Sequence, residues 1–360
     1  LTLRYNPKNR PSFPHKTLED FTPTESDPNG IIIEKMLCDA IENKLKDYDS
    51  IGVSLSGGVD SSLVLALIRK VFPKKEILTY TMRMYGATDE TIRAKYLSKK
   101  YGAQNVSMHS FSILENMDYL VNMTDEPRWN TYPGFVAEVC KEVGHDILVT
   151  GDGADELFAG YVFRYSKFLN SMWRTEDYLR CHENDWVEDQ ERMLQNFNWD
   201  EIYPHLYKYF EGSDPLTNCL LADYNGKLLH DFIPTTQAYS RKFGIPIFSP
   251  FLTEEIRNYS THLPNKEKFD GKLGKLQLRK ISTRIGLEQH NEKIGMAPNL
   301  PKEWKDIGLF CRTALLNPNC KIYHELVNYS WVEKSINSLD DKRIVNKLTQ
   351  LYALEMWLSC

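Results

Sequence analysis

Residues 54–62 read Ser54-Leu55-Ser56-Gly57-Gly58-Val59-Asp60-Ser61-Ser62. An apolar run over residues 51–55 leads into this stretch, and an apolar stretch with helical spacing over residues 62–71 follows it. A buried strand that turns through two glycines into a helix is the repeating unit of an open parallel sheet, in which ligands bind at the carboxyl ends of the strands. The stretch therefore predicts both a parallel α/β fold and the place where its ligand binds.

The side chains of this stretch have the chemistry of a phosphate-binding loop. Gly57 and Gly58 let the backbone approach an anion closely, while Ser56, Ser61 and the free amides at the helix start donate hydrogen bonds. Asp60 would repel a phosphate unless a divalent cation lay between them, so it predicts magnesium. The glycines alone would fit a tight turn equally well, and the flanking residues favour binding. Because the loop contains no Gly-Lys-Ser or Gly-Lys-Thr, transfer of the terminal phosphate is disfavoured.

Strand and helix patterns alternate on both sides of this loop. They predict a parallel sheet covered by helices on both faces, which ends near Tyr161 and is followed by a mainly helical half. Five prolines in residues 1–30 favour an extended arm ahead of the folded body. The further predicted strands cover residues 77–82, 106–111 and 146–150, and the predicted helices cover residues 31–45, 90–101, 135–143 and 344–357.

Composition excludes several classes of protein. With 360 residues and 42% hydrophobic content the chain can bury a large core, and its net charge of −5 gives no field that would attract a polyanion. Nucleic acid is therefore not an expected partner. The seven cysteines form no CxxC pair and are interpreted as reduced thiols, and no apolar run reaches the roughly 20 residues that span a bilayer. We expect a cytoplasmic protein that has no membrane contact.

A second motif carries three acids. The segment Thr150-Gly151-Asp152-Gly153-Ala154-Asp155-Glu156 again follows a predicted strand and turns through glycine. Clustered carboxylates repel one another unless a metal ion or a shifted pKa relieves the repulsion, which makes such clusters candidates for function. The alternative is a solvated acidic loop with helix-capping acids.

Together the two motifs resemble the PP-loop ATP pyrophosphatases, whose fingerprint is Ser-Gly-Gly-x-Asp-Ser. Within that superfamily the chain is most similar to the synthetase domain of asparagine synthetase and of the related β-lactam synthetases. The resemblance implies that Asp155 shares magnesium with Asp60, and that Asp152 stands where the family often has glutamate. The proline content and the change of pattern divide the chain into an arm (residues 1–30), a nucleotide-binding part (about 31–165) and a helical part (about 166–360). The residues assigned to ATP are Ser54, Leu55, Ser56, Gly57, Gly58, Asp60, Ser61, Met82, Thr150 and Gly151.

Further segments extend the resemblance. Asp125-Glu126-Pro127 is similar to a family loop near the acyl substrate, and residues 247–252 are similar to the Pro-Phe-Leu-Asp segment, although Thr253 replaces the acid. A core strand or turn explains that second segment equally well. The resemblance implies that Lys293 neutralises charge at the α-phosphate. Lys275 and Arg279 are as well explained by structural pairing, and we leave them out of the catalytic set.

These assignments predict a ligase that uses ATP and Mg²⁺ to adenylate a carboxylate, with aspartate as the first choice, and then transfers nitrogen to it. The catalytic set is Lys293, Asp152, Asp60 and Asp155. Related asparagine synthetases usually carry an N-terminal glutaminase domain with a cysteine nucleophile, whereas Cys38, the first cysteine here, lies in a predicted core helix. The arm resembles only the last strand of that domain. We therefore expect the nitrogen to come from free ammonia, an amine or a separate glutaminase subunit.

Other interpretations stay open. A relative that closes a β-lactam or amidates another small acid would share the phosphate-binding loop, but the retained Asp152 favours amide formation between two molecules. A tRNA-modifying enzyme would need a basic surface and often catalytic cysteines, which the composition does not support. A nucleotide-binding subunit without activity, and assembly into a homo-oligomer, are further alternatives.

Overall fold

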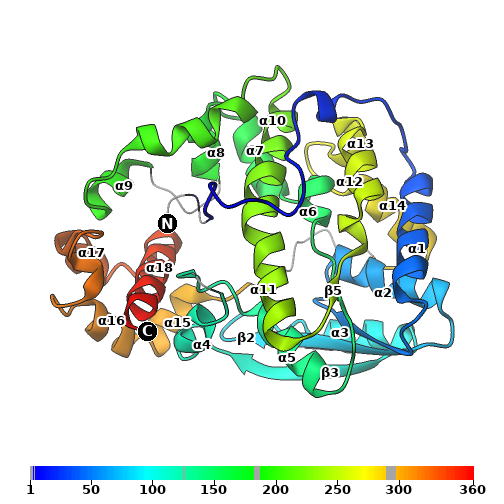
Figure 1. Cartoon of the computed structure of the whole chain (residues 1–360), viewed down its shortest axis with the longest axis horizontal. Helices are drawn as coiled ribbons and strands as arrows, with labels where there is room; N and C mark the ends of the chain where they lie inside the picture. Colours follow the sequence, from blue (N-terminus) through cyan, green and yellow to red (C-terminus); the bar gives the residue numbers. More distant parts are fainter. Residues whose placement is uncertain (1–2, 4, 125, 182–186, 289–296) are drawn as a thin grey trace.

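A five-stranded sheet in which every pair of neighbouring strands is parallel forms the centre of the α/β part (Figure 1). The computed structural model describes residues 3, 5–124, 126–181, 187–288 and 297–360. The strand order is β3-β2-β1-β4-β5, so β1 is central. The parallel α/β prediction is confirmed, and the strands are β1 (Ser50–Ser54), β2 (Glu76–Met84), β3 (Gln104–Phe111), β4 (Leu148–Val149) and β5 (Ile247–Phe248).

The side chains of each strand point alternately to the two faces of the sheet, and each face carries its own apolar cluster. Ile51, Val53 and Leu55 are fully buried in a cluster that includes side chains of α1, α2 and α3. Tyr80 and Met82 of β2 belong to the other cluster, which includes residues of α5 and of the C-terminal helices. Because successive side chains of a strand point to opposite faces, the two clusters show that helices cover both faces, as the sequence predicts.

The helices of the α/β part start and end close to the predicted positions. Asp60 lies in the first turn of α2, and Arg69 and Lys70 lie in its last turn, so the charges oppose the helix dipole at both ends. The predicted helix over residues 62–71 begins three residues earlier than expected, because the glycine turn ends at Gly58. The helices of this part are α1 (Ile31–Leu45), α2 (Val59–Val71), α3 (Thr91–Lys100), α4 (Met117–Val121), α5 (Pro133–Glu142) and α6 (Ala154–Leu157).

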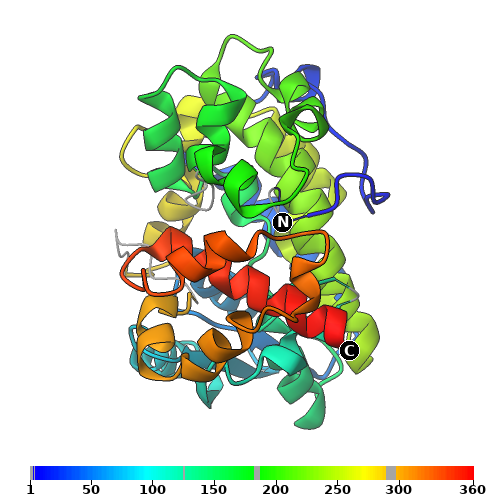
Figure 2. The ribbon, with the colours of Figure 1, turned by 90° about the vertical axis from the view of Figure 1, so that its left-hand side faces the viewer.

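The part that follows is mainly helical, as expected (Figures 1 and 2), but it returns to the sheet once to add β5. The last helix, α18, begins after Asp341, whose carboxylate accepts the amides of Arg343 and Ile344. Among the described residues, no helix combines the length and apolar character needed to span a bilayer. The helices are α7 (Val162–Leu169), α8 (Thr175–Cys181), α9 (Val187–Met193), α10 (Pro215–Ala222), a π-helix (Asp223–Phe232), α11 (Ile233–Phe243), α12 (Glu254–Thr261), α13 (Asn265–Lys268), α14 (Leu276–Arg284), α15 (Leu300–Asp306), α16 (Leu309–Leu315), α17 (Tyr329–Ser335) and α18 (Lys342–Ser359).

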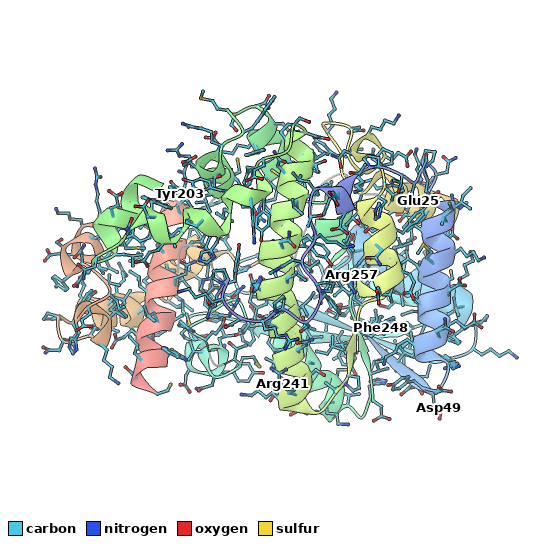
Figure 3. The ribbon with its side chains drawn as sticks, turned by 45° about the horizontal axis from the view of Figure 1, so that its top comes forward. Glu25, Asp49, Tyr203, Arg241, Phe248 and Arg257 are labelled. Atoms are coloured by element: carbon cyan, nitrogen blue, oxygen red, sulfur yellow. The ribbon has the colours of Figure 1, made fainter. Side chains whose placement is uncertain are left out.

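The N-terminal arm lies across the helical part rather than against the sheet (Figure 3). Lys16 and Asn225 of the π-helix exchange two hydrogen bonds of 2.8 Å, from the backbone amide of Lys16 and to its carbonyl. The guanidinium of Arg257 on α12 lies 3.8 Å from the ring centroid of Phe13. The described part of the arm contains only short turns and one short helical turn, Glu19–Phe21, and it docks on the helical part through both backbone and side-chain contacts.

Candidate active site

The loop between β1 and α2 folds as the strand-turn-helix unit that the sequence predicts. Gly57 adopts a φ of +76°, a backbone conformation that residues other than glycine rarely adopt. The backbone amide of Ser56 donates to Ser61 Oγ at 3.2 Å, and the amide of Gly58 donates to Ser56 Oγ at 3.3 Å. The two serine hydroxyls therefore shape the loop from within, and a ligand would have to compete for these contacts.

The second acidic motif lies beside this loop because β4 is the neighbour of β1. The register pairs Val53 with Val149, so the residues that follow both strands emerge at one edge of the sheet. A Cβ on Gly151 would lie 3.0 Å from Asp60 Cβ and 3.2 Å from the amide nitrogen of Ser61. Such contacts are tighter than ordinary packing allows, so the close approach of the two loops depends on this glycine.

The carboxylates of Asp60 and Asp155 converge on one ammonium group, that of Lys275. Lys275 Nζ lies 2.5 Å from Asp60 Oδ2 and 2.8 Å from Asp155 Oδ1, and the lysine side chain is 8% exposed. Desolvation alone would lower the pKa of Lys275, but the two carboxylates outweigh it and hold the pKa above its ordinary value. The sequence explains Lys275 by structural pairing, and the structure shows that its partners are the two predicted metal ligands.

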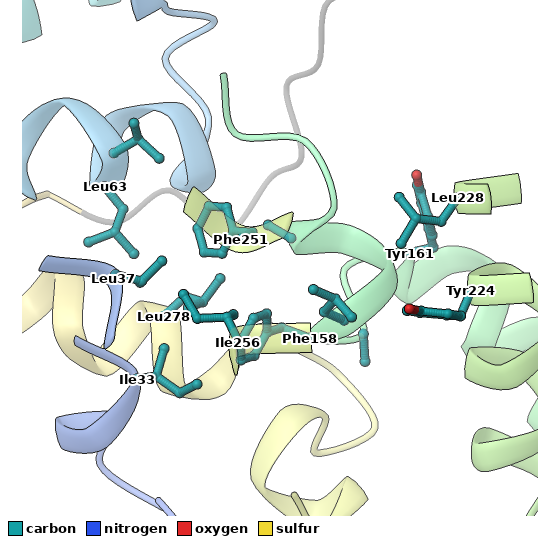
Figure 4. Packing of buried hydrophobic residues seen from close by; sticks show 14 of the residues in the cluster. Ile33, Leu37, Leu63, Phe158, Tyr161, Tyr224, Leu228, Phe251, Ile256 and Leu278 are labelled. Atoms are coloured by element: carbon teal, nitrogen blue, oxygen red, sulfur yellow. The ribbon is translucent and has the colours of Figure 1, made fainter. Parts of the chain in front are cut away.

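Local backbone geometry brings Lys275 to this position. Its φ is +58°, in the left-handed region, and its amide donates to the carbonyl of Phe158 at 2.8 Å, which ties the start of α14 to the end of α6. Behind these segments Phe158, Phe251 and Leu278 pack together in the apolar core (Figure 4). A rigid core thus holds together three loops that are distant in the sequence.

Gly160 provides the space that the ion pair occupies, and we expect a Gly160→Ala variant to lose activity at least tenfold. The new Cβ would lie 1.8 Å from Asp155 Oδ1 and 2.2 Å from Lys275 Cε, so the pair must separate. We expect the free energy of unfolding to fall by about 1–3 kcal/mol, as overpacked cores do. Denaturant titration and an AMP-formation assay measure the two effects. Gly144→Ala is the control for lost stability alone, because its φ of +103° strains an alanine backbone while the new Cβ meets no atom within 4 Å; equal activity in both variants would contradict the prediction.

Among the three acids of the motif, Asp152 is the most accessible to solvent. It accepts a hydrogen bond of 2.9 Å from the hydroxyl of Thr150, and Ser249 Oγ donates to its backbone carbonyl at 2.6 Å. The surrounding protein raises the pKa of Asp152, first by desolvation and then by repulsion from Asp60 and Asp155. An accessible carboxylate with a raised pKa is suited to exchange a proton with a substrate.

Glu156, the third acid of the motif, points into the protein instead. Its side chain is 1% exposed and accepts a hydrogen bond of 2.5 Å from the hydroxyl of Tyr161. Lys227 Nζ of the π-helix lies 3.8 Å from Glu156 Oε1 and 3.7 Å from the centroid of the Tyr161 ring. Glu156 is therefore a structural acid, and the acidic cluster divides into a site half and a buried half.

The donor set at the site fits magnesium. Two carboxylates from separate loops already share one cation, and Mg²⁺ in nucleotide sites is usually held by one or two carboxylates, substrate phosphates and water. Among the described residues, no group of three or more histidines, cysteines or acids could hold a metal without such help. Asp60 and Asp155 would thus bind Mg²⁺ together with a phosphorylated substrate.

The remaining predicted residues fall into three groups. Ser54 ends β1, whereas Leu55 and Met82 are buried, so their assignment to ATP stays a prediction. Lys293 and Asp125 lie outside the described residues. In the acyl-substrate loop, Glu126 forms an ion pair with the buried guanidinium of Arg128, which also pairs with Asp231 of the π-helix. Residues 247–252 form β5 and a short helical turn, Pro250–Leu252, which agrees with the structural explanation given to them.

Comparisons with known proteins identify the family of the chain. The family model described as asparagine synthase matches residues 33–359. A Methanocaldococcus jannaschii protein named as a glutamine-hydrolysing asparagine synthetase is 29% identical over 136 residues, which cover 36% of this chain and 26% of that protein. A second such protein of the same organism is 26% identical over 245 residues, or 66% of this chain and 37% of that protein. The chain thus spans about a quarter to two fifths of the length of these relatives.

Among solved structures, an NH3-dependent NAD synthetase of Campylobacter jejuni aligns with a TM-score of 0.31 and 16% identity, covering 55% of this chain and 93% of that one.

Proposed function

Because the chain belongs to the asparagine synthase family, we propose that it is a magnesium-dependent ligase that adenylates a carboxylic acid with ATP and converts it to an amide. The observation that carries the proposal is the convergence of Asp60 and Asp155 on one cation position beside the Ser-Gly-Gly loop. This is the arrangement needed to hold the charge of a polyphosphate while its bond to the α-phosphorus breaks.

In the proposed reaction, a carboxylate oxygen of the substrate attacks the α-phosphorus of ATP. The bond between that phosphorus and the bridging oxygen breaks, and pyrophosphate leaves with both electrons of the bond. Mg²⁺ bound at Asp60 and Asp155 would offset the charge on the leaving group. The amides of the loop would add positive potential at the same place, and the ammonium of Lys275, which Mg²⁺ must displace from between the two carboxylates, would act beside the metal ion.

Amide formation needs a group that receives a proton from the attacking nitrogen. Ammonia attacks the acyl adenylate, AMP leaves, and a proton must be lost from the new amide nitrogen. Asp152 supports this role, since its carboxylate is accessible and lies within the electrostatic influence of Asp60 and Asp155. The raised pKa of Asp152 makes it a better proton acceptor than an ordinary aspartate.

Aspartate is the proposed acyl substrate, and asparagine the product. The nitrogen would come from free ammonia, from an amine or from a separate glutaminase subunit. The test supplies ATP, MgCl₂ and ammonium with a panel of carboxylic acids, and follows AMP, pyrophosphate and the amide by chromatography. AMP that depends on aspartate supports the proposal, AMP that depends on another acid changes the substrate only, and ADP as the sole nucleotide product would exclude this chemistry. No nucleotide turnover with any acid would favour a binding subunit.

A further inference from the structure

We propose that Arg93, at the start of α3, is a phosphate-binding residue that contacts the pyrophosphate part of the nucleotide at Gly57. The inference rests on the proposed function, and it adds a second cationic side chain to the phosphate-binding loop. Lys275 reaches this loop at Asp60, whereas Arg93 reaches it at Gly57. The sequence motifs give no hint of this residue, since Arg93 lies on α3, 36 residues after Gly57 of the loop.

The side chain of Arg93 lies directly against the loop. A Cβ on Gly57 would meet Arg93 Cδ at 3.1 Å, Cγ at 3.4 Å and Nε at 3.5 Å. Gly57 has a positive φ, so its amide and its neighbours form the concave turn in which phosphate oxygens are held. The Arg93 side chain thus lies in contact with the loop residue at which we place a phosphate oxygen.

The hydrogen-bonding capacity of Arg93 is not used up by the protein. Its Nε is buried and has no hydrogen-bond partner in the described part of the chain, while Nη2 donates to the carbonyl of Glu288 at 3.3 Å. A buried N–H without a partner is unfavourable unless a ligand or water satisfies it. Burial also lowers the pKa of Arg93, which shows that the charge lies in a partly desolvated place where an anion would be bound more strongly.

Glu90, the residue just before α3, does not satisfy the hydrogen-bonding groups of Arg93. Its Oε1 is buried without a hydrogen-bond partner, and desolvation raises the pKa of Glu90 to about 7 although Arg93 opposes the shift. A carboxylate that formed a close ion pair would have its pKa held low instead. The planar guanidinium therefore keeps donors for two oxygens of a phosphate, which is the geometry for which arginine is used.

The test is pyrophosphate binding, measured by isothermal titration calorimetry in the presence of MgCl₂ without an acyl substrate. Arg93→Ala should weaken pyrophosphate binding about 10- to 100-fold, as expected for the loss of hydrogen bonds to a charged group. Arg93→Lys, which keeps the charge but not the fork, should recover part of the affinity. AMP binding, measured in the same way, should change less than threefold in both variants, because AMP lacks the outer phosphates.

Lys100→Ala is a matched control, since Lys100 is a cation of the same helix whose Nζ donates to the carbonyl of Gly286 at 2.6 Å. Both variants lose one positive charge and one contact to the segment that follows α14, but only Arg93 lies against the loop. An equal loss of pyrophosphate affinity in Lys100→Ala would show that Arg93 acts by anchoring that segment and would overturn the inference. Unchanged affinity in Arg93→Ala would overturn it while leaving the proposed function in place. A wild-type protein that does not bind pyrophosphate would overturn both.

Discussion

An Asp60→Asn variant should form AMP at least about a thousandfold more slowly than the wild type, because it removes one of two carboxylates that would hold Mg²⁺ at the leaving pyrophosphate. The substitution changes charge and not shape. Lys275 keeps Asp155 as a partner at 2.8 Å, so the free energy of unfolding should fall by no more than about 1.5–3 kcal/mol, the cost of one lost hydrogen bond to a charged group. The expected result is a folded protein without turnover. AMP formation and denaturant titration measure the two quantities separately.

The matched control for this variant is Asp39→Asn, which removes the same charge from an exposed position on α1. It should retain wild-type activity. Raising the MgCl₂ concentration should recover part of the activity of Asp60→Asn, since a weakened metal site fills at higher metal concentration. Activity within tenfold of the wild type at low MgCl₂ would mean that the metal is held elsewhere.

The fold was predictable from sequence because local and global signals agree. Residues 51–55 are apolar, Gly57 and Gly58 stop the strand, and apolar residues with helical spacing follow, so the same order of elements is favoured at each level. Strand β5 was harder to predict. Its two residues, Ile247 and Phe248, pair with β4 alone and lie between helices, and such a short edge strand leaves no periodic pattern.

The pairing of Asp60 with Asp155 was also predictable in outline, because the carboxyl ends of parallel strands meet at one edge of a sheet. Lys275 was not. A lysine between a glycine and a leucine looks like any solvated lysine, and what places it is the φ of +58° together with the hydrogen bond to Phe158, which are tertiary features. One signal was present in the sequence: Gly274 precedes Lys275, and a Cβ there would lie 1.9 Å from the carbonyl of Ala159.

The different environments of the three acids in the second motif could not be predicted from the sequence either. Asp152, Asp155 and Glu156 are neighbours in sequence, yet one is accessible, one pairs with Lys275 and one is buried against Tyr161. Residues three or four apart on a helix share a face, but α6 has only four residues and its neighbours decide which way each acid points. Sequence spacing therefore identified the group of acids without assigning their separate roles.

The ammonium of Lys275 occupies the position between carboxylates where a metal ion would bind, and a Lys275→Met variant tests this directly. Methionine has similar length and no charge, so Asp60 and Asp155 are left to repel each other in a largely buried place. Breaking a buried pair in this way should lower the free energy of unfolding by about 3 kcal/mol in the absence of metal. AMP formation should fall about a hundredfold as well, since a cation at the leaving group is lost.

Magnesium should then stabilise Lys275→Met more than it stabilises the wild type. In the wild type Mg²⁺ must compete with the ammonium group of Lys275 for the two carboxylates. In the variant this ammonium group is absent, so Mg²⁺ should bind more tightly and stabilise the folded protein more. Thermal unfolding with increasing MgCl₂, without nucleotide, measures the difference, and Lys272→Met, at an exposed position three residues earlier, is the control. Equal shifts of the melting temperature in all three proteins would show that the two carboxylates do not form a shared cation site, and the proposed role of Asp60 and Asp155 would fail with it.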